Sequence, residues 1–210
     1  MLDVTRCFVL LSVLWAAIAL IAQVAAARGG GREEYGERSG SPGKGMLHNF
    51  TIAMLPWHKE TVKHHPGKFA AGVIMHMGVI LTLADAVVVL IRPTTGLIDV
   101  WSYTRWVVAC SLVSGVYLLV RRICSRNLRV MSASEDYVSI LATCGLLAFA
   151  LLRSIDSQYQ LIFLAYVGLF FVFLPLGKLR HSVFFFVARG DYGRRLGYRG
   201  VYPPTMERMK

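Results

Sequence analysis

One long apolar run, Pro66–Ile91, constrains what this chain can fold into more than any other feature. It reads PGKFAAGVIMHMGVILTLADAVVVLI. An α-helix rises about 1.5 Å per residue and the hydrocarbon core of a bilayer is about 30 Å thick, so this run can cross a membrane as a helix. One histidine, His76, lies inside the run. An ionisable side chain at such a depth is costly and usually serves a function.

The composition also indicates a membrane protein. Hydrophobic residues make up 55% of the 210 residues and charged residues only 17%, which is less charge than a soluble domain carries. The apolar residues form blocks rather than a helical period. The net charge of +11 comes from basic residues that flank these blocks. Membrane orientation explains them better than nucleic-acid binding, so we expect contact with membrane lipid and no nucleic-acid partner.

The apolar blocks predict an all-α membrane protein, a bundle of five transmembrane helices. We expect the fifth helix to begin near Tyr159 and to run past Pro175, with a kink at that proline. Trp101, Tyr103 and Trp106 form an aromatic belt at the start of the third helix. The other four helices are predicted at about 7–27, 67–91, 102–120 and 136–153.

The loops between these blocks predict the orientation. Basic residues cluster at 28–68, at 121–136 and in the C-terminal tail, whereas the loops at 92–103 and 153–158 are poor in charge. The positive-inside rule therefore places the N-terminus outside and the C-terminus in the cytoplasm, in a multi-pass protein of the cytoplasmic (inner) membrane. The end of the first block, AQVAAARGGG, also resembles a signal-peptidase site, but the loop charges favour a retained helix.

Four regions follow from this topology. The first is a transmembrane helix that can act as a signal anchor, and the second is a cytoplasmic loop. Residues 28–45 of that loop are rich in Gly, Arg, Glu and Ser and predict a flexible segment, while 48–65 predict an interfacial helix. A four-helix membrane domain and a basic cytoplasmic tail follow. The regions are 1–27, 28–66, 67–188 and 189–210.

Two histidines are candidate ligands of one haem. His76 lies in the second helix, and His181 lies in PLGKLRHSVFFF at the cytoplasmic end of the fifth. Neutral imidazoles on separate helices can hold one iron between them. No CxxCH motif is present, so the group would be a non-covalent haem b. The alternative is that His76 hydrogen-bonds inside the bundle and that His181 faces lipid headgroups.

Glycines and basic residues near the two histidines extend this prediction. Gly72 and Gly177 each precede a histidine by four residues. Residues four apart share a helix face, so each glycine would leave space for a flat macrocycle. Basic side chains at the cytoplasmic interface can pair with the haem propionates. These are Lys178, Arg180, Arg121 and Arg122.

Three segments carry a family resemblance: IMHMGVIL, RRICSRNLRVMSASEDYVSIL and PLGKLRHSVFFF. In this order, within about 68–185, they resemble the gamma subunit of respiratory nitrate reductase. They are also similar to related membrane cytochromes b of dissimilatory sulfite reductase and heterodisulfide-reductase-like complexes. The resemblance implies five transmembrane helices and two b-type haems between the second and fifth. It also implies that His76 and His181 ligate the haem nearer the cytoplasm.

The sequence departs from the family pattern at the second haem. The family has further histidines in its second and fifth helices, where this chain has Ala86 and Phe163. We therefore expect one haem. The family's quinol site lies near the outer haem, so quinol oxidation by this chain is an open question.

The resemblance implies an electron-transfer subunit of a respiratory complex that is not catalytic alone. It would link the quinone pool to a cytoplasmic iron–sulfur or catalytic subunit, which docks on the basic loop after the third helix and on the tail. Two alternatives stay open. One is a haem-free membrane anchor of such a complex. The other is a small transporter, for which Asp85 is the acidic candidate in the second helix.

Overall fold

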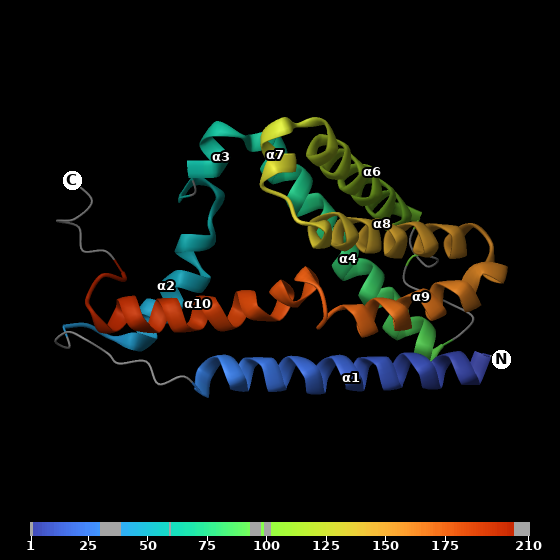
Figure 1. The fold of residues 1–210 in the computed structure, drawn as a ribbon, viewed down its shortest axis with the longest axis horizontal. Helices are drawn as coiled ribbons and strands as arrows, with labels where there is room; N and C mark the ends of the chain where they lie inside the picture. The colour runs from blue at the N-terminus through green and yellow to red at the C-terminus, as the bar shows by residue number, and fades with distance from the viewer. Residues whose placement is uncertain (1, 30–38, 59, 93–97, 99–101, 204–210) are drawn as a thin grey trace. The chain divides into compact units, whose positions relative to one another are not determined.

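A computed structural model describes residues 2–29, 39–58, 60–92, 98 and 102–203, and in these residues the chain is all-helical (Figure 1). The chain forms two compact units. Unit 1 is Met1–Ala19 with Gly67–Leu179, and unit 2 is Leu20–Pro66 with Arg180–Lys210. Trp101 of the predicted aromatic belt, residues 30–38 of the predicted flexible segment and the last seven residues of the tail lie outside the described residues.

Four helices are long and apolar enough to cross a membrane. They are α1 (Leu2–Gly29), α4 (Pro66–Ile91), α6 (Ser102–Cys124) and α8 (Ser134–Ile155). A fifth span is counted if α9 (Gln160–Phe173) and α10 (His181–Tyr198), on either side of a break, form one. The first four predicted helices are confirmed, and the chain is a multi-pass helical membrane protein.

The predicted fifth helix is interrupted rather than kinked. α9 ends at Phe173, and a 3-10 turn, η4 (Lys178–Arg180), precedes α10. Between them lies Pro175, whose missing N–H and bulky ring break a helix. The amides of Leu176 and Gly177 both donate to the carbonyl of Phe173, at 3.0 and 3.1 Å, and close a turn. Gly177 therefore does not share a helix with His181, and that prediction is wrong.

Unit 1 is built from neighbouring helices of the bundle: α6 packs on α8, and α8 packs on α9 (Figure 1). Small residues let the helices approach closely, as in other membrane bundles. A side chain on Gly78 of α4 would collide with Ser111 of α6, whose hydroxyl donates to the carbonyl of Ile74 at 2.7 Å. The indole of Trp15 in α1 donates to the carbonyl of Val172 at 3.3 Å.

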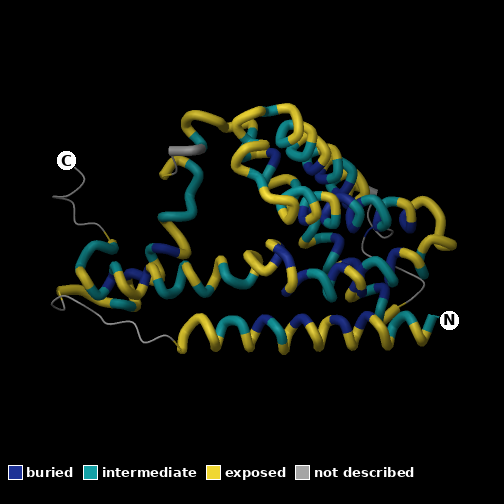
Figure 2. The backbone as a smooth tube through the Cα atoms, in the orientation of Figure 1, coloured by how far each residue is buried: buried dark blue, intermediate teal, exposed yellow. Residues whose placement is uncertain are grey.

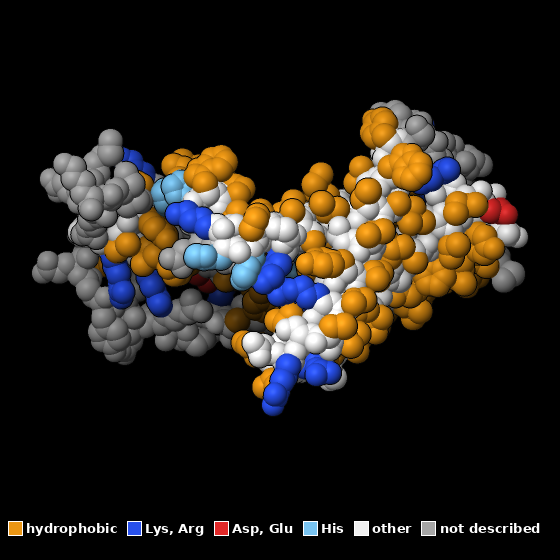
Figure 3. All heavy atoms as spheres, turned by 90° about the horizontal axis from the view of Figure 1, so that it is seen from above, with side chains coloured by type: hydrophobic (Ala, Val, Ile, Leu, Met, Phe, Trp, Pro, Cys, Tyr) orange, Lys and Arg blue, Asp and Glu red, His pale blue; other side chains and the backbone are white. Residues whose placement is uncertain are grey.

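Burial in unit 1 is inverted relative to a soluble protein. Leu146, Phe163 and Leu164 are fully buried between helices, while large apolar side chains such as Ile80 and Val113 are 68% and 69% exposed. Figure 2 shows buried and exposed positions alternating along the helices. On the face drawn in Figure 3, hydrophobic side chains spread over the helices of the bundle with few charges among them. Such a surface would aggregate in water, and it is the surface expected of helices in lipid.

Unit 2 is centred on a pair of helices, α2 (Pro42–Phe50) and α10. Ser41 caps α2, and Pro42 occupies its first turn. Gly45 lies against Gly193 and Gly197, where a side chain would strike the opposite backbone, so the two backbones approach closely.

Two sequence predictions for unit 2 need correction. The expected interfacial helix at 48–65 is instead the end of α2, two 3-10 turns and α3 (Glu60–His64), and α2 already begins within the segment predicted to be flexible. The predicted boundary between residues 188 and 189 falls inside α10.

Candidate functional site

His76 lies near the middle of α4, ten residues after Pro66. Its side chain is exposed on an apolar face that also carries Val73 and Ile80. Its Nδ1 lies 2.6 Å from the carbonyl oxygen of Gly72. A carbonyl only accepts hydrogen bonds, so Nδ1 is the donor and the ring lone pair lies on Nε2. A bond of this kind orients the imidazole ligands of metal sites.

The two glycines predicted to make room for a ring differ in their surroundings. A Cβ on Gly72 would meet no atom within 4 Å, as predicted for an open patch beside His76. A Cβ on Gly177 would strike the ring of Phe173. The space beside Gly177 is therefore filled by protein, and its predicted role as an open patch is wrong.

His181 is the first residue of α10 and is exposed. It belongs to unit 2, whereas His76 belongs to unit 1. The meeting of the two imidazoles on one iron stays a prediction.

Two of the four basic residues predicted to bind propionates already have an acidic partner. Lys178 and Arg122 approach one oxygen of Asp136, at 2.8 and 3.6 Å, and Arg122 also donates to the hydroxyl of Ser132 at 2.7 Å. Arg121 is half-buried and Arg180 is exposed. Asp136, in the first turn of α8, thus gathers positive charge from Arg122 of α6 and Lys178 of η4. It would compete with a propionate for these side chains.

A buried ion pair lies toward the C-terminal end of α4. The carboxylate of Asp85 accepts from the Arg153 guanidinium at 2.8 Å and from the amide of Ile98 at 3.0 Å. The side chains of Asp85 and Arg153 are 0% and 4% exposed. The sequence predicted Arg153 at the boundary between the fourth helix and the loop that follows it, and it lies in the last turn of α8. The missed signal is that Asp85 and Arg153 are opposite charges near the ends of the second and fourth apolar blocks that the predicted topology places on the same side of the membrane.

Ala86 and Phe163, which stand where the resembling family has the histidines of its second haem, lie beside this ion pair. Ala86 and Phe163 are 2% and 0% exposed. The Arg153 guanidinium lies 5.6 Å from the centre of the Phe163 ring, a cation–π distance. Protein atoms therefore pack both positions, and neither side chain can ligate iron.

Comparison of the whole chain with protein-family models, with curated proteins and with solved structures gives no match.

Proposed function

We propose that this chain is a membrane cytochrome b subunit that binds one haem b between His76 and His181. It would carry electrons between the quinone pool and a cytoplasmic iron–sulfur partner in a respiratory complex of the inner membrane. The observation that carries the proposal is the setting of His76. Within an apolar span, its imidazole is exposed, its Nδ1 is held by the Gly72 carbonyl, and the adjacent Gly72 surface is open.

The donor set fits a haem. The sequence has six histidines, and of these only His76 lies inside one of the four long spans that the described residues contain. Exposing an imidazole on an apolar face is unfavourable unless the face is covered. A flat, largely apolar macrocycle with a metal centre would cover the face and use the Nε2 lone pair.

Each part of the chain has a separate task in this proposal. When bound, a bis-histidine haem b accepts and releases one electron. The Gly72 carbonyl keeps the His76 proton on Nδ1 and directs Nε2 away from its own helix. Arg121 and Arg180 are the better propionate partners, since Arg122 and Lys178 share Asp136.

The partner surface in this proposal is the connection between α6 and α8. It contains the short helix α7 (Arg126–Val130), where Arg126 and Arg129 are exposed. Val130 and Met131 are 82% and 83% exposed beside them. Basic side chains around apolar ones suit an acidic protein partner, and the positive-inside rule puts this loop in the cytoplasm.

Absorption spectra of the full-length protein test the proposal. The protein would be made in cells supplied with a haem precursor and purified in mild detergent. We expect a Soret band and sharp visible bands in the dithionite-reduced form. A preparation that is folded and free of haem, and that takes up none from added haemin, would favour the haem-free anchor instead.

A further inference from the structure

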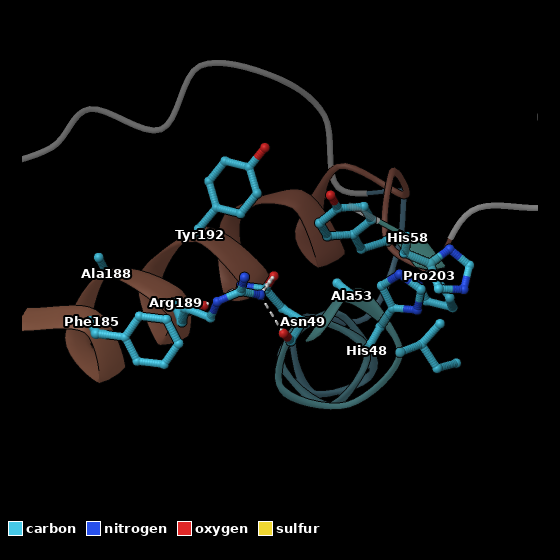
Figure 4. A pocket seen from close by; sticks show the side chains of 11 residues that line it. His48, Asn49, Ala53, His58, Phe185, Ala188, Arg189, Tyr192 and Pro203 are labelled. Atoms are coloured by element: carbon cyan, nitrogen blue, oxygen red, sulfur yellow. Dashed lines mark hydrogen bonds between the residues drawn. The ribbon is translucent and has the colours of Figure 1, made fainter. Parts of the chain in front are cut away.

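Unit 2 contains a large cavity between α10 and the segment that begins with α2 (Figure 4). Its volume is about 810 Å³, within the usual range for a ligand site. Phe185, Arg189 and Tyr192 line it from α10. His48, Ile52 and His58 are among the residues that line it from the other side, and Tyr202 lies beyond the end of α10.

The polar groups that line this cavity can donate hydrogen bonds, and no carboxylate is among the described lining residues. The Nδ1 atom of His48 is buried without a hydrogen-bond partner in the described part of the chain. Its ring lies 4.9 Å from that of Tyr202. Burial raises the pKa of the Tyr202 hydroxyl, and the adjacent Tyr192 raises it further, so this hydroxyl remains a donor at neutral pH. Such a lining suits an oxyanion.

Arg189 is held in position before any ligand arrives. Its Nη1 donates to the backbone carbonyl of Asn49 at 2.6 Å and to the Asn49 side-chain oxygen at 2.9 Å. The Asn49 amide donates back to the Arg189 carbonyl at 2.7 Å, and Figure 4 shows the two side chains facing each other. These bonds use one terminal nitrogen, which leaves Nη2 and Nε to donate elsewhere. Asn49 is neutral, so this interaction leaves the charge of Arg189 uncompensated.

The end of α1 puts this cavity at a membrane surface. α1 is a span of 28 residues, and its Ala27 and Arg28 line a second cavity of about 210 Å³ together with residues of α10. Ala188 and Tyr192 line both cavities. The larger cavity thus lies beside the end of a span, at the level of lipid headgroups.

Apolar side chains continue from the cavity to the surface of unit 2. Ile52 lines it and is 46% exposed, and Trp57 is 64% exposed next to the lining residue His58. The rings of Phe50 and Phe186 stack at 6.5 Å, and both are exposed. A lipid would match both features, with its anionic headgroup in the donor-lined cavity and its acyl chains along the exposed apolar side chains.

We propose that this cavity binds the phosphate of an anionic phospholipid, with Arg189 and His48 as its main contacts and the acyl chains along the exposed aromatic side chains. Basic pockets beside membrane spans are known to hold such headgroups. A lipid headgroup and free phosphate both present a phosphate oxyanion, and we propose that the ligand of this cavity is the membrane lipid. Haem plays no part, so haem-free protein is expected to bind the lipid equally.

Lipid binding to the full-length protein in detergent tests this proposal. Short-chain phosphatidylglycerol and phosphatidylcholine would be titrated separately, and binding would be followed by native mass spectrometry. Both lipids carry the phosphate, but the choline ammonium of phosphatidylcholine compensates its charge and would lie close to Arg189. We therefore expect phosphatidylglycerol to bind at least about tenfold more tightly. Equal binding of the two lipids would overturn the proposal. So would inorganic phosphate that binds at this site while phosphatidylglycerol does not.

Three variants locate the site. Arg189→Gln should weaken phosphatidylglycerol binding about tenfold. Arg194→Gln is the matched control, because Arg194 is an exposed arginine of the same helix that lines neither cavity. Equal losses in the two variants would mean general charge attraction and would contradict a built site. If Arg189→Gln does not fold, Ala188→Trp fills the cavity from an exposed position without changing charge. Normal lipid binding by that variant would refute the assignment.

Discussion

Two ionisable side chains of α4, His76 near its middle and Asp85 toward its C-terminal end, lie in opposite settings. Asp85 is completely buried and accepts hydrogen bonds from Arg153 and from the Ile98 amide. His76, nine positions earlier in the same helix, is exposed on an apolar face. Its hydrogen bond to Gly72 stays within its own helix.

This difference separates a structural role from a functional one. A charge surrounded by protein is stabilised only by its protein partner, so Asp85 belongs to the packing of α4 and α8. The imidazole of His76 is oriented by its own helix, but its exposed face leaves room for a group that is not part of α4. It is therefore the better candidate for ligand binding. Asp85, the acidic candidate for the small transporter considered from the sequence, is engaged in this ion pair.

Breaking the ion pair should give the largest effect on folding. Asp85→Ala leaves the Arg153 guanidinium in the core without its carboxylate, which we expect to lower the free energy of unfolding by about 3–5 kcal/mol. Unfolding in mixed micelles with increasing SDS would measure the loss. Asp85→Leu combined with Arg153→Met should recover most of the stability. A single Asp85→Ala variant as stable as the wild type would refute the structural role.

The glycines of α4 provide a second, smaller contrast. Gly78→Leu would force a side chain into Ser111 of α6, and we expect a loss of about 1–3 kcal/mol from overpacking. Gly72→Leu meets open space and should leave unfolding unchanged while it impairs haem uptake. Haem uptake that survives Gly72→Leu would show that this surface does not receive the ring.

The ion pairs of Asp136 test whether burial determines how much an ion pair contributes to the free energy of unfolding. Lys178 is 45% exposed in its pair with Asp136, so solvent weakens this attraction. Asp136→Asn should cost no more than about 1 kcal/mol, against several for Asp85→Ala in the same unfolding assay. It should also release Lys178 and Arg122. A loss as large as that of Asp85→Ala would mean that exposure does not distinguish the two clusters.

The sequence predicted most of the membrane architecture and only part of the site. Apolar length alone located α1, α4, α6 and α8, because a bilayer fixes the length of a span. The same criterion cannot detect an interruption inside an apolar stretch, and Pro175 signalled a kink where the helix in fact ends. Side-chain spacing also failed at Gly177, since residues four apart share a face only if the helix is continuous.

Contacts between distant segments were harder to foresee. The pairing of Asp85 with Arg153 joins residues 68 positions apart, and the bonds between Asn49 and Arg189 join residues 140 apart. Neither partner is marked by a local pattern. By contrast, His76 stood out because a histidine in an apolar run is rare and costly.

The central claim is tested most directly on the wild type and three histidine variants, by haem content from pyridine haemochrome and by haem spin state from the absorption spectrum of the intact protein. The account predicts one haem b per chain in the wild type. It predicts loss of low-spin haem in both His76→Ala and His181→Ala, because each removes an axial ligand. His64→Ala is the matched control and should keep a full complement, since His64 lies in α3, outside the long spans. Close to two haems per chain, or full low-spin haem in either ligand variant, would contradict the account.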